Sequence, residues 1–455
     1  MQARHDPFHY LPKFLRLEAK VAAKSPAKLR DFVRALAGGA TPKTEEKEKY
    51  YADSTTGIPF VRVQNLSVSG QLQLDDVKYV NHETHNGLLA RSQVNADDLL
   101  VKITGVGRMA VASVPPPGFE GNINQHIARI RTDNRRTSKI LAAWLNTDIA
   151  EALAKRRSTG GTRPALDYGA LRSIPVIFNE GILDAIEAAY QQHSEALIHA
   201  SKKLDSIDQY LIAELGITLP PKQKNTIANR VFTAQWRELS GWRFDPDMAV
   251  YSRHTRTSRF QLSTLKSHML VPPQYGANER GIERVTKDVP RYVRITDVNE
   301  FGELSEGLGV AAEVANKKYL LAHDDLLFAR SGNTVGKAYL HAETHDEHYI
   351  FAGYMIRFRL NPATLLPRYA FAYTLCSAYK EWCLAVQRAA GQPNINAEEY
   401  KSLLIPVPPI DKQVEIADHV FQIREQAKRL RQKAENELKI AKCRIEAMLL
   451  DEVTS

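Results

Sequence analysis

The sequence contains an internal duplication. RSTGGTRPALDYGALRSIPV at residues 157–176 and GQPNINAEEYKSLLIPVPP at residues 391–409 follow one plan: a turn, a short helix-like patch and an apolar run with proline. Further matches lie upstream at a spacing of about 230 residues, which is far too long for a solenoid repeat. A duplication of this length predicts two homologous domains in one chain.

The matching segments occur in the same order in both halves. First half to second half, they are Arg4–Pro7 with Arg243–Pro246, Phe60–Leu66 with Tyr292–Val298, Asp97–Val101 with Asp324–Phe328, Gly105–Arg108 with Gly332–Lys337, and Ile174–Val176 with Ile405–Val407. Each Ile-Pro-Val closes its half, and after it the sequence pattern changes in the same way.

Two long segments after these closing tripeptides carry apolar or small residues at alternating spacings of three and four. The positions are Ile186, Tyr190, His193, Leu197, Ala200, Leu204, Ile207 and Leu211 in residues 181–215, and Ile416, Val420, Ile423, Ala427, Leu430, Ala434, Leu438, Ala441, Ile445 and Met448 in residues 410–450. This spacing is typical of a coiled-coil seam. The second helix would be on the order of 60 Å long, too long for one wall of a compact domain. A helical hairpin inside a larger core is the alternative.

Short segments rich in valine and isoleucine precede each long helix and predict β-strands. One helical patch follows the strands in each half, at residues 139–157 and 368–389. We therefore predict an α+β fold, with two tandem domains separated by long helices that form an antiparallel, pseudo-twofold-symmetric coiled coil. The predicted boundaries are domain 1 at 1–179, spacer helix 1 at 180–215, a linker at 216–240, domain 2 at 241–409 and spacer helix 2 at 410–450.

Composition limits the class of protein. The 44% of hydrophobic and 25% of charged residues are ordinary for a soluble globular chain. No apolar run approaches the roughly 20 residues of a membrane-spanning helix, and the start lacks a secretory pattern, so we expect a soluble, cytoplasmic protein. Cys376, Cys383 and Cys443 are too few for a disulfide framework or a zinc site. We expect Cys376 and Cys383 to be buried on one helix face.

Lysine and arginine exceed aspartate and glutamate by nine, 61 against 52, which weakly favours a polyanionic partner. The duplication adds a geometric argument, because dimeric DNA-binding proteins use twofold symmetry to place two reading heads on one duplex. A duplicated chain keeps that arrangement and lets the two heads diverge. The expected target is a bipartite, asymmetric DNA sequence with a gap that the helices set.

The closing segment of the second half carries a family resemblance. Gly391, Ile395, Asn396, Ile405, Pro406, Pro408, Pro409 and Gln413 resemble the end of a target-recognition domain in specificity subunits of type I restriction-modification enzymes. DDLLFARSGNTVGKAYL at residues 324–340 and Gly38–Pro42 resemble other parts of that domain. The resemblance spans essentially the whole chain. The first half departs from the pattern, since Ile177–Asn179 replaces the proline pair and Gly105–Arg108 replaces the Gly-x-x-x-Gly-Lys turn.

The resemblance implies a DNA-recognition subunit without catalytic activity. Two methyltransferase subunits would bind the helices, and motor-nuclease subunits would join that core. A partner would flip an adenine and methylate it. The resemblance implies no cofactor in this chain, and places S-adenosylmethionine, ATP and magnesium on the partners. A copy that serves another phage-defence system would have the same sequence features.

An enzymatic role is an alternative interpretation of the sequence. The single Asn-Pro pair, Asn361–Pro362, is followed by alanine, and no phosphate-binding loop is present. The pairs Asp97–Asp98 and Asp324–Asp325 could suggest a metal-dependent nuclease, but adjacent strand residues point to opposite faces, so a strand-entry role is expected. HETH at 82–85 and HDEH at 345–348 lack a third metal ligand nearby. A coiled-coil scaffold with protein-binding domains is the remaining alternative.

Candidate DNA contacts follow from residue type. Phosphate contacts are predicted for Lys102, Arg108, Arg330 and Lys337, at matching strand-turn-strand places in the two halves, with a basic cluster at Lys155, Arg156, Arg157 and Arg163. Base contacts are predicted for Arg62, Gln64, Asn65, Asn122, Asn124 and Gln125 in the first half and Arg294, Thr296, Asp297 and Asn333 in the second.

Overall fold

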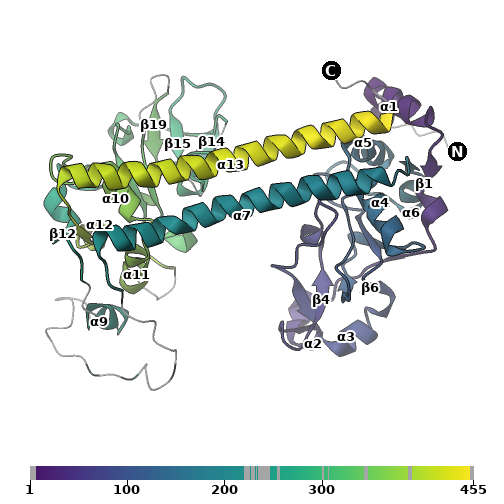
Figure 1. The fold of residues 1–455 in the computed structure, drawn as a ribbon, viewed down its shortest axis with the longest axis horizontal. Helices are drawn as coiled ribbons and strands as arrows, with labels where there is room; N and C mark the ends of the chain where they lie inside the picture. Colours follow the sequence, from purple (N-terminus) through teal and green to yellow (C-terminus); the bar gives the residue numbers. More distant parts are fainter. Residues whose placement is uncertain are drawn as a thin grey trace. The chain divides into compact units, whose positions relative to one another are not determined.

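The chain divides into two compact units. The computed structural model describes residues 7–219, 226, 231, 233, 246–253, 257–299, 302–305, 307–342, 347–387 and 392–450. Unit 1 comprises residues 1–196 and 433–455, and unit 2 comprises residues 197–432 (Figure 1). Each unit thus includes part of both long helices, and the domain boundaries drawn from the sequence stay predictions. Arg4–Asp6, Arg243–Asp245, most of the predicted linker, His345 and Gly391 lie outside the described residues.

The described residues of unit 1 form three sheets. One has the strand order β2 (Ala35–Gly38), β10 (Ile127–Arg131), β7 (Leu99–Lys102) and β8 (Ala112–Ser113). The second has the order β3 (Tyr51–Ala52), β5 (Lys78–Val80), β4 (Ile58–Val61), β9 (Glu120–Ile123) and β6 (Gln93–Asn95), with β4 and β9 parallel. The third pairs β1 (Ala27–Lys28) with β11 (Pro175–Val176).

Unit 2 repeats these sheets among its described residues, except that its second sheet lacks a counterpart of β6 and has four strands. Its first sheet has the order β13 (Gln274–Tyr275), β20 (Met355–Phe358), β17 (Leu326–Ala329) and β18 (Ala338–Leu340). Its second has the order β14 (Gly281–Glu283), β16 (Val310–Ala312), β15 (Arg291–Val293) and β19 (Tyr349–Phe351), with β15 and β19 parallel. The third pairs β12 (Leu262–Thr264) with β21 (Leu404–Pro406). The predicted α+β fold with two similar domains is therefore confirmed.

The central strands β7 and β17 are buried on both faces, which explains their continuous apolar sequences. Leu99 packs into the core beneath the helices of unit 1, whereas its neighbour Leu100 packs between the two large sheets. Leu326 and Leu327 divide in the same way in unit 2. Each unit is thus layered as helices, sheet and second sheet, because alternate residues of one strand serve two cores.

The predicted single helical patch of each half is two helices. Unit 1 has α1 (Pro12–Ala22), α2 (Lys47–Tyr50), α3 (His82–Asn86), α4 (Arg135–Leu145), α5 (Asp148–Arg157) and α6 (Tyr168–Arg172), and unit 2 has α9 (Pro246–Arg253), α10 (Pro367–Tyr373), α11 (Ser377–Val386) and α12 (Ala397–Lys401). The break between α4 and α5 has a side-chain cause. Asn146 exchanges hydrogen bonds with the Ala112 backbone, and Thr147 Oγ1 accepts one from Ala150 N at 3.1 Å. Side chains that bind backbone in this way favour a helix start over continuation.

The two long helices are α7 (Gly181–Leu215) and α13 (Ile410–Leu450). In unit 1 the first turns of α7 and the last turns of α13 share a core, with Ile445 buried. In unit 2 Ala200 packs against Ala427, and Lys412 Nζ lies 2.7 Å from a Glu214 carboxylate oxygen. The pairing is therefore antiparallel, as predicted. The predicted seam positions are buried or half-buried except Met448, which is 70% exposed.

The closing segments correct one predicted alignment. Asp167 caps α6 and Asn396 caps α12, each accepting a hydrogen bond from the backbone N–H three residues later. In the two-stranded third sheets, Pro175 pairs with Lys28 and Leu404 pairs with Thr264. Lys28 and Thr264 are equivalent, because each directly precedes a four-residue 3-10 helix. Ile174–Val176 therefore corresponds to residues 403–405, and the alignment with Ile405–Val407 was wrong by two residues.

Cys376 and Cys383 are buried, as predicted, although Cys376 lies at the cap of α11 and only Cys383 within the helix. Burial raises the pKa of each thiol to about 12. Cys443 is exposed on α13.

Candidate nucleic-acid interface

The turns after β4 and β15 have the same construction. The Arg62 N–H donates to Asn65 Oδ1 at 2.9 Å, and the Arg294 N–H donates to Asp297 Oδ2 at 3.1 Å. The predicted match between Phe60–Leu66 and Tyr292–Val298 is therefore correct residue by residue. Asn65 and Asp297 are buried, so their side chains form the turns and face away from solvent.

Both arginines of these turns have carboxylate partners. Arg62 Nη2 lies 3.3 Å from Asp76 Oδ2, and Gln64 Nε2 donates to the same oxygen at 2.7 Å. Arg294 Nη2 lies 2.8 Å from Asp297 Oδ1. A DNA phosphate or base would have to compete with these carboxylates, although Gln64, Arg294 and Thr296 are exposed.

Three predicted phosphate contacts are engaged inside the fold. Lys102 Nζ donates to Val106 O at 2.7 Å, and burial lowers its pKa. The Arg108 guanidinium donates to Asp148 and to two backbone carbonyls of the α4–α5 turn, and Lys337 Nζ donates to Val298 O. We therefore expect these three cations to hold the hairpins in place rather than to contact phosphate.

The hairpins match, but their cations do not occupy equivalent positions. The Lys102 N–H donates to Val111 O, and the Ala329 N–H donates to Lys337 O, so Lys102 corresponds to Ala329. Arg330 consequently corresponds to Ile103, whose side chain is buried. The predicted equivalence of the cations in the two hairpins was therefore incorrect.

The amide residues at the end of β9 and in the turn that follows it differ in access to solvent. Asn122 is fully buried, with its Oδ1 2.7 Å from His85 Nδ1 and its Nδ2 donating to Leu89 O at 3.0 Å. Asn124 is buried, and its Oδ1 accepts from the backbone of the turn itself. Gln125 is exposed and accepts a hydrogen bond from the Thr41 hydroxyl. Of these three residues, we expect only Gln125 to reach DNA.

The basic cluster at the end of α5 packs against α1. Arg157 Nη2 lies 2.5 Å from Glu18 Oε1, Arg156 pairs with the same carboxylate, and Lys155 Nζ lies 2.8 Å from Glu151 Oε1. Burial lowers the pKa of Arg157 to about 10. Arg163, in contrast, is exposed and forms no hydrogen bond or ion pair with another described residue.

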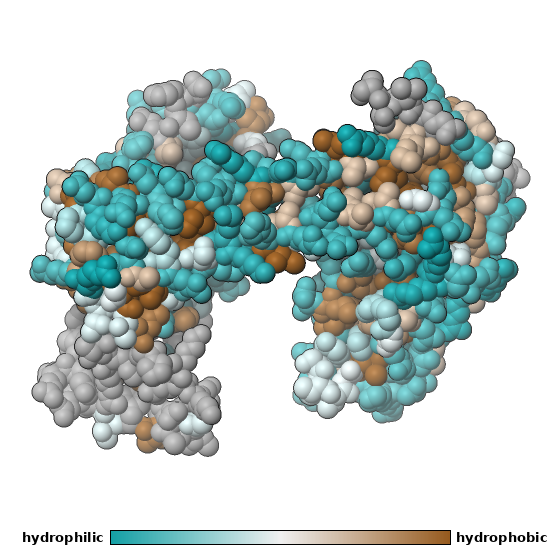
Figure 2. All heavy atoms as spheres, in the orientation of Figure 1, coloured by the Kyte–Doolittle hydropathy of each residue, from teal (hydrophilic) through white to brown (hydrophobic). Residues whose placement is uncertain are grey.

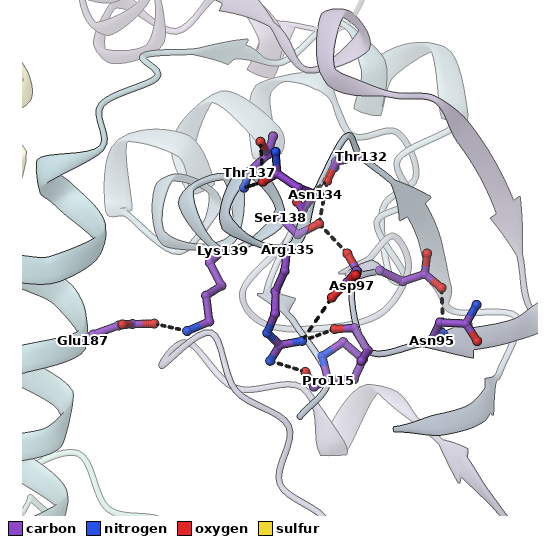
Figure 3. A network of polar contacts seen from close by, with 12 residues as sticks. Asn95, Asp97, Pro115, Thr132, Asn134, Arg135, Thr137, Ser138, Lys139 and Glu187 are labelled. Atoms are coloured by element: carbon purple, nitrogen blue, oxygen red, sulfur yellow. Dashed lines mark hydrogen bonds and ion pairs between the residues drawn. The ribbon is translucent and has the colours of Figure 1, made fainter. Parts of the chain in front are cut away.

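The paired aspartates are at strand entries. Asp98 Oδ2 accepts from the Asn95 N–H at 2.8 Å, and Asp325 Oδ2 accepts from the Ala322 N–H at 2.9 Å. Figure 3 shows the network beside Asp97, where its carbonyl accepts from Ser138 Oγ at 2.6 Å. These contacts support the predicted strand-entry role. Within the described ranges, no group of three histidine, cysteine, aspartate or glutamate side chains is placed to hold a metal ion.

Arg330 has a partner that sequence reasoning missed. Its guanidinium lies over the ring of Tyr275, 4.9 Å from the centroid, and the exposed Tyr354 accepts a backbone hydrogen bond from Arg330 N. The exposed Gln392 lies nearby, because its Nε2 would be 3.1 Å from a Cβ on Gly332. Gln392 belongs to the quoted closing segment, so its residue type could have indicated it. Tyr275 carried no such signal.

Residues 286–439 match the family model described as "Type I restriction modification DNA specificity domain". Residues 286–439 therefore carry a type I restriction-modification DNA specificity domain. A similar curated protein is the Type I restriction enzyme EcoKI specificity subunit of Escherichia coli strain K12. It is 22% identical over 405 residues, which are 86% of this chain and 80% of that protein.

Solved specificity-subunit structures align over most of the chain. The HsdS subunit from Thermoanaerobacter tengcongensis gives a TM-score of 0.33 at 14% identity, covering 93% of this chain and 95% of that one. The type I S subunit from M. genitalium gives 0.40 at 11% identity, covering 94% and 96%. A chain from a study of type I complex assembly and conformational transition gives 0.48 at 14% identity, covering 93% and 96%.

The matched residues lie in the second half and in α13. Unit 1 lies largely outside the match, yet its described residues form three sheets that correspond to those of unit 2, with one additional strand, β6, in the second sheet. Among the described residues, no helix has both the length and the apolar character needed to cross a membrane.

Proposed function

We propose that this chain is a specificity subunit of a type I restriction-modification system and reads a bipartite, asymmetric DNA site, with each unit contacting one half of it. The observation that carries the proposal is the duplicated scaffold, since both units have the same sheets, the same capped closing helix and the same close-packed glycine, Gly39 or Gly276. Two copies of one DNA-binding scaffold that differ at exposed positions are suited to read two different sequences.

The long helices are proposed to set the gap and to dock two methyltransferase subunits, which motor-nuclease subunits then join. Exposed apolar side chains on these helices, such as Ile198, Ile440 and Met448, fit surfaces that a partner covers. Figure 2 shows such apolar residues scattered among hydrophilic ones over the visible face. S-adenosylmethionine, ATP and magnesium belong, in this proposal, to the partners, and the assembly acts in the cytoplasm.

A non-catalytic role for this chain agrees with how its ionisable residues are used. The carboxylates considered for a nuclease hold strand entries, and His85 is buried between Asn122 and Glu120. The chain is therefore proposed to choose the sequence while partner subunits carry out the chemistry.

Methylation mapping by long-read sequencing tests the proposal. The source cell is compared with the same cell lacking this gene, and with that cell after the gene is restored. We expect methylation to disappear at one gapped, asymmetric motif and to return on restoration. An unchanged pattern in an active system would contradict the proposal.

Purified assemblies provide a second test that separates the proposed function from a protein-binding scaffold. A DNA reader loses affinity steeply as salt rises, because phosphate contacts release counterions. Binding of the methyltransferase–specificity complex to the mapped motif is measured by fluorescence anisotropy at several salt concentrations. A scaffold predicts no specific binding at any of them.

A further inference from the structure

We propose that two adjacent turns form the sequence-reading edge of each unit. In unit 1 these are the hairpin at residues 103–110 and the closing turn at 159–166, and in unit 2 they are the hairpin at 330–336 and the turn at 392–396. The inference rests on the proposed function and assigns residues to it.

The backbone frame of the edge is the same in both units. The Gly105 N–H donates to Pro164 O at 3.1 Å, and the Gly332 N–H donates to Pro393 O at 3.0 Å. Both glycines have a positive φ, of 119° and 77°, which lets the hairpin turn toward the closing turn. The closing turn is then fixed by a capped helix in each unit. A frame of this kind holds side chains in defined positions.

The exposed side chains on this frame differ between the units. The shared backbone contacts make Gly105 equivalent to Gly332 and Pro164 equivalent to Pro393. Arg163 of unit 1 therefore corresponds to Gln392 of unit 2, and Val106 corresponds to Asn333. Val106 is 74% exposed. At the neighbouring turn, His126 corresponds to Tyr354. A constant frame with variable exposed residues is what two heads need to read different sequences.

A tyrosine covers each edge, but it comes from opposite segments. In unit 1 the tyrosine is Tyr168, the first residue of the closing helix α6. Its hydroxyl fills the space that a Cβ on Gly38 would occupy. In unit 2 the position of Gly38 is taken by Tyr275, whose hydroxyl accepts from the Ala397 N–H at 3.1 Å. Both rings are roughly 40% exposed, at 43% and 40%. The exchange changes the shape and polarity of the edge while keeping the space filled.

Arg330 supplies a fixed positive charge to the edge of unit 2. It lies over Tyr275 and has no ion pair or side-chain hydrogen bond with any described residue, and its Nε is shielded without a partner. Arg62, Arg294 and Arg108, in contrast, all have carboxylate partners. A held guanidinium without a counter-charge is suited to a DNA phosphate.

The amides beside Arg330 are suited to base edges. Asn333 and Gln392 are exposed, and the Gln392 amide lies against Gly332 of the hairpin. Asparagine and glutamine can each pair with adenine through two hydrogen bonds. We assign Arg330 as the phosphate contact of unit 2 and Asn333 and Gln392 as its base contacts. In unit 1 the edge cation is Arg163, which occupies the position of Gln392 rather than that of Arg330.

The test uses the complete methyltransferase–specificity complex and DNA carrying the mapped motif. Arg330→Ala should weaken binding to all sequences about tenfold or more and lower the salt dependence by about one phosphate contact. Asn333→Ala and Gln392→Ala should lower discrimination about fivefold to a hundredfold in one half-site alone. Lys318→Ala is the matched control, because Lys318 also lies over a tyrosine, Tyr319, at 4.7 Å but outside the edge.

Each outcome separates the edge from the proposed function. If the wild-type complex shows no specific binding, the proposed function fails. If it binds but all three edge variants behave like Lys318→Ala, the edge is disproved and the function stands. Thermal unfolding of each complex checks its folding, and Arg330→Lys, which keeps the charge, should retain more affinity than Arg330→Ala. Equal loss in these two variants together with a lowered melting temperature would assign Arg330 a structural role instead.

Discussion

Gly39 and Gly276 occupy the same position in the two units, each directly against the backbone carbonyls at the end of a parallel strand. A Cβ on Gly39 would meet the carbonyls of Ile123 and Asn124, and one on Gly276 would meet those of Phe351 and Ala352. Backbone cannot move aside as a flexible side chain can, so this approach requires glycine in both units.

Alanine at either glycine should therefore destabilise its unit. We expect Gly39→Ala and Gly276→Ala each to lower the free energy of unfolding by about 1–3 kcal/mol. Urea denaturation followed by circular dichroism measures the change. Gly161→Ala is the control, since no heavy atom lies within 4 Å of its Cβ position. Equal stability of all three variants would refute the close approach.

The caps of the closing helices predict a second effect. Asp167 Oδ1 accepts from the Ala170 N–H at 2.7 Å, and Asn396 Oδ1 accepts from the Glu399 N–H at 2.9 Å. Alanine at either cap should cost about 1 kcal/mol, because an N–H of the first turn loses its acceptor. Asp167→Asn keeps an acceptor and should retain most of the stability. A loss as large in Asp167→Asn as in Asp167→Ala would argue against capping.

Two bidentate ion pairs differ mainly in burial. Arg359 binds Asp325, which is buried, while Arg34 binds Asp133 at an exposed site, each pair with a shortest N–O distance of 2.6 Å. Asp325→Ala should destabilise unit 2 by about 3–5 kcal/mol, because Asp325 also pairs with the buried Arg357, whose charge would lose its carboxylate partner. Asp133→Ala should cost much less, because solvent screens an exposed ion pair. Denaturation midpoints that shift equally would contradict this ranking.

Thiol reactivity should distinguish the cysteines. Cys376 and Cys383 are buried and their thiol pKa values are raised to about 12, so little thiolate forms at pH 8. Iodoacetamide should modify the native chain once, at Cys443, and should reach all three cysteines only in denaturant. Mass spectrometry of peptides locates the adducts, and early modification of Cys383 would show that this core opens.

His268 should make unit 2 sensitive to acid. Its ring nitrogens lie 2.9 Å from the hydroxyls of Ser263 and Thr364, and burial lowers its pKa. Below the ordinary histidine pKa of about 6.5, the unfolded chain binds a proton that the folded chain refuses. Stability should therefore fall as pH drops below 6.5. The unfolding midpoint of His268→Asn should depend less on pH across this range than that of the wild type, whereas exposed His82→Asn should match the wild type.

The sequence predicted the elements that local pattern determines. The match of Phe60–Leu66 with Tyr292–Val298 was correct because apolar strand residues and a polar turn residue recur at the same spacing in both. The seam of α7 followed from its periodicity alone. The closing register was missed because identical Ile-Pro-Val tripeptides were aligned, whereas the caps Asp167 and Asn396 determine the correspondence.

Features that depend on distant parts of the chain could not be read from the sequence. The break after Leu145 requires the backbone of Ala112, and the stacking of Arg330 on Tyr275 requires that β13 and β17 both flank β20. Asn122 is of the right residue type for base contact, but tertiary structure buries it beside His85. Residue type selects candidates, and only the fold shows which of them reach solvent.

The discontinuity of unit 1 has a consequence for its biosynthesis. Its hydrophobic core includes Ile445 and Leu449, which the ribosome adds only after all of unit 2 has been made. The core of unit 1, most of which is translated first, is therefore completed last. Its apolar surface around Ile186 stays uncovered until the final turns of α13 have been synthesised. A nonsense mutation that removes the last turns of α13 would consequently damage unit 1 before unit 2.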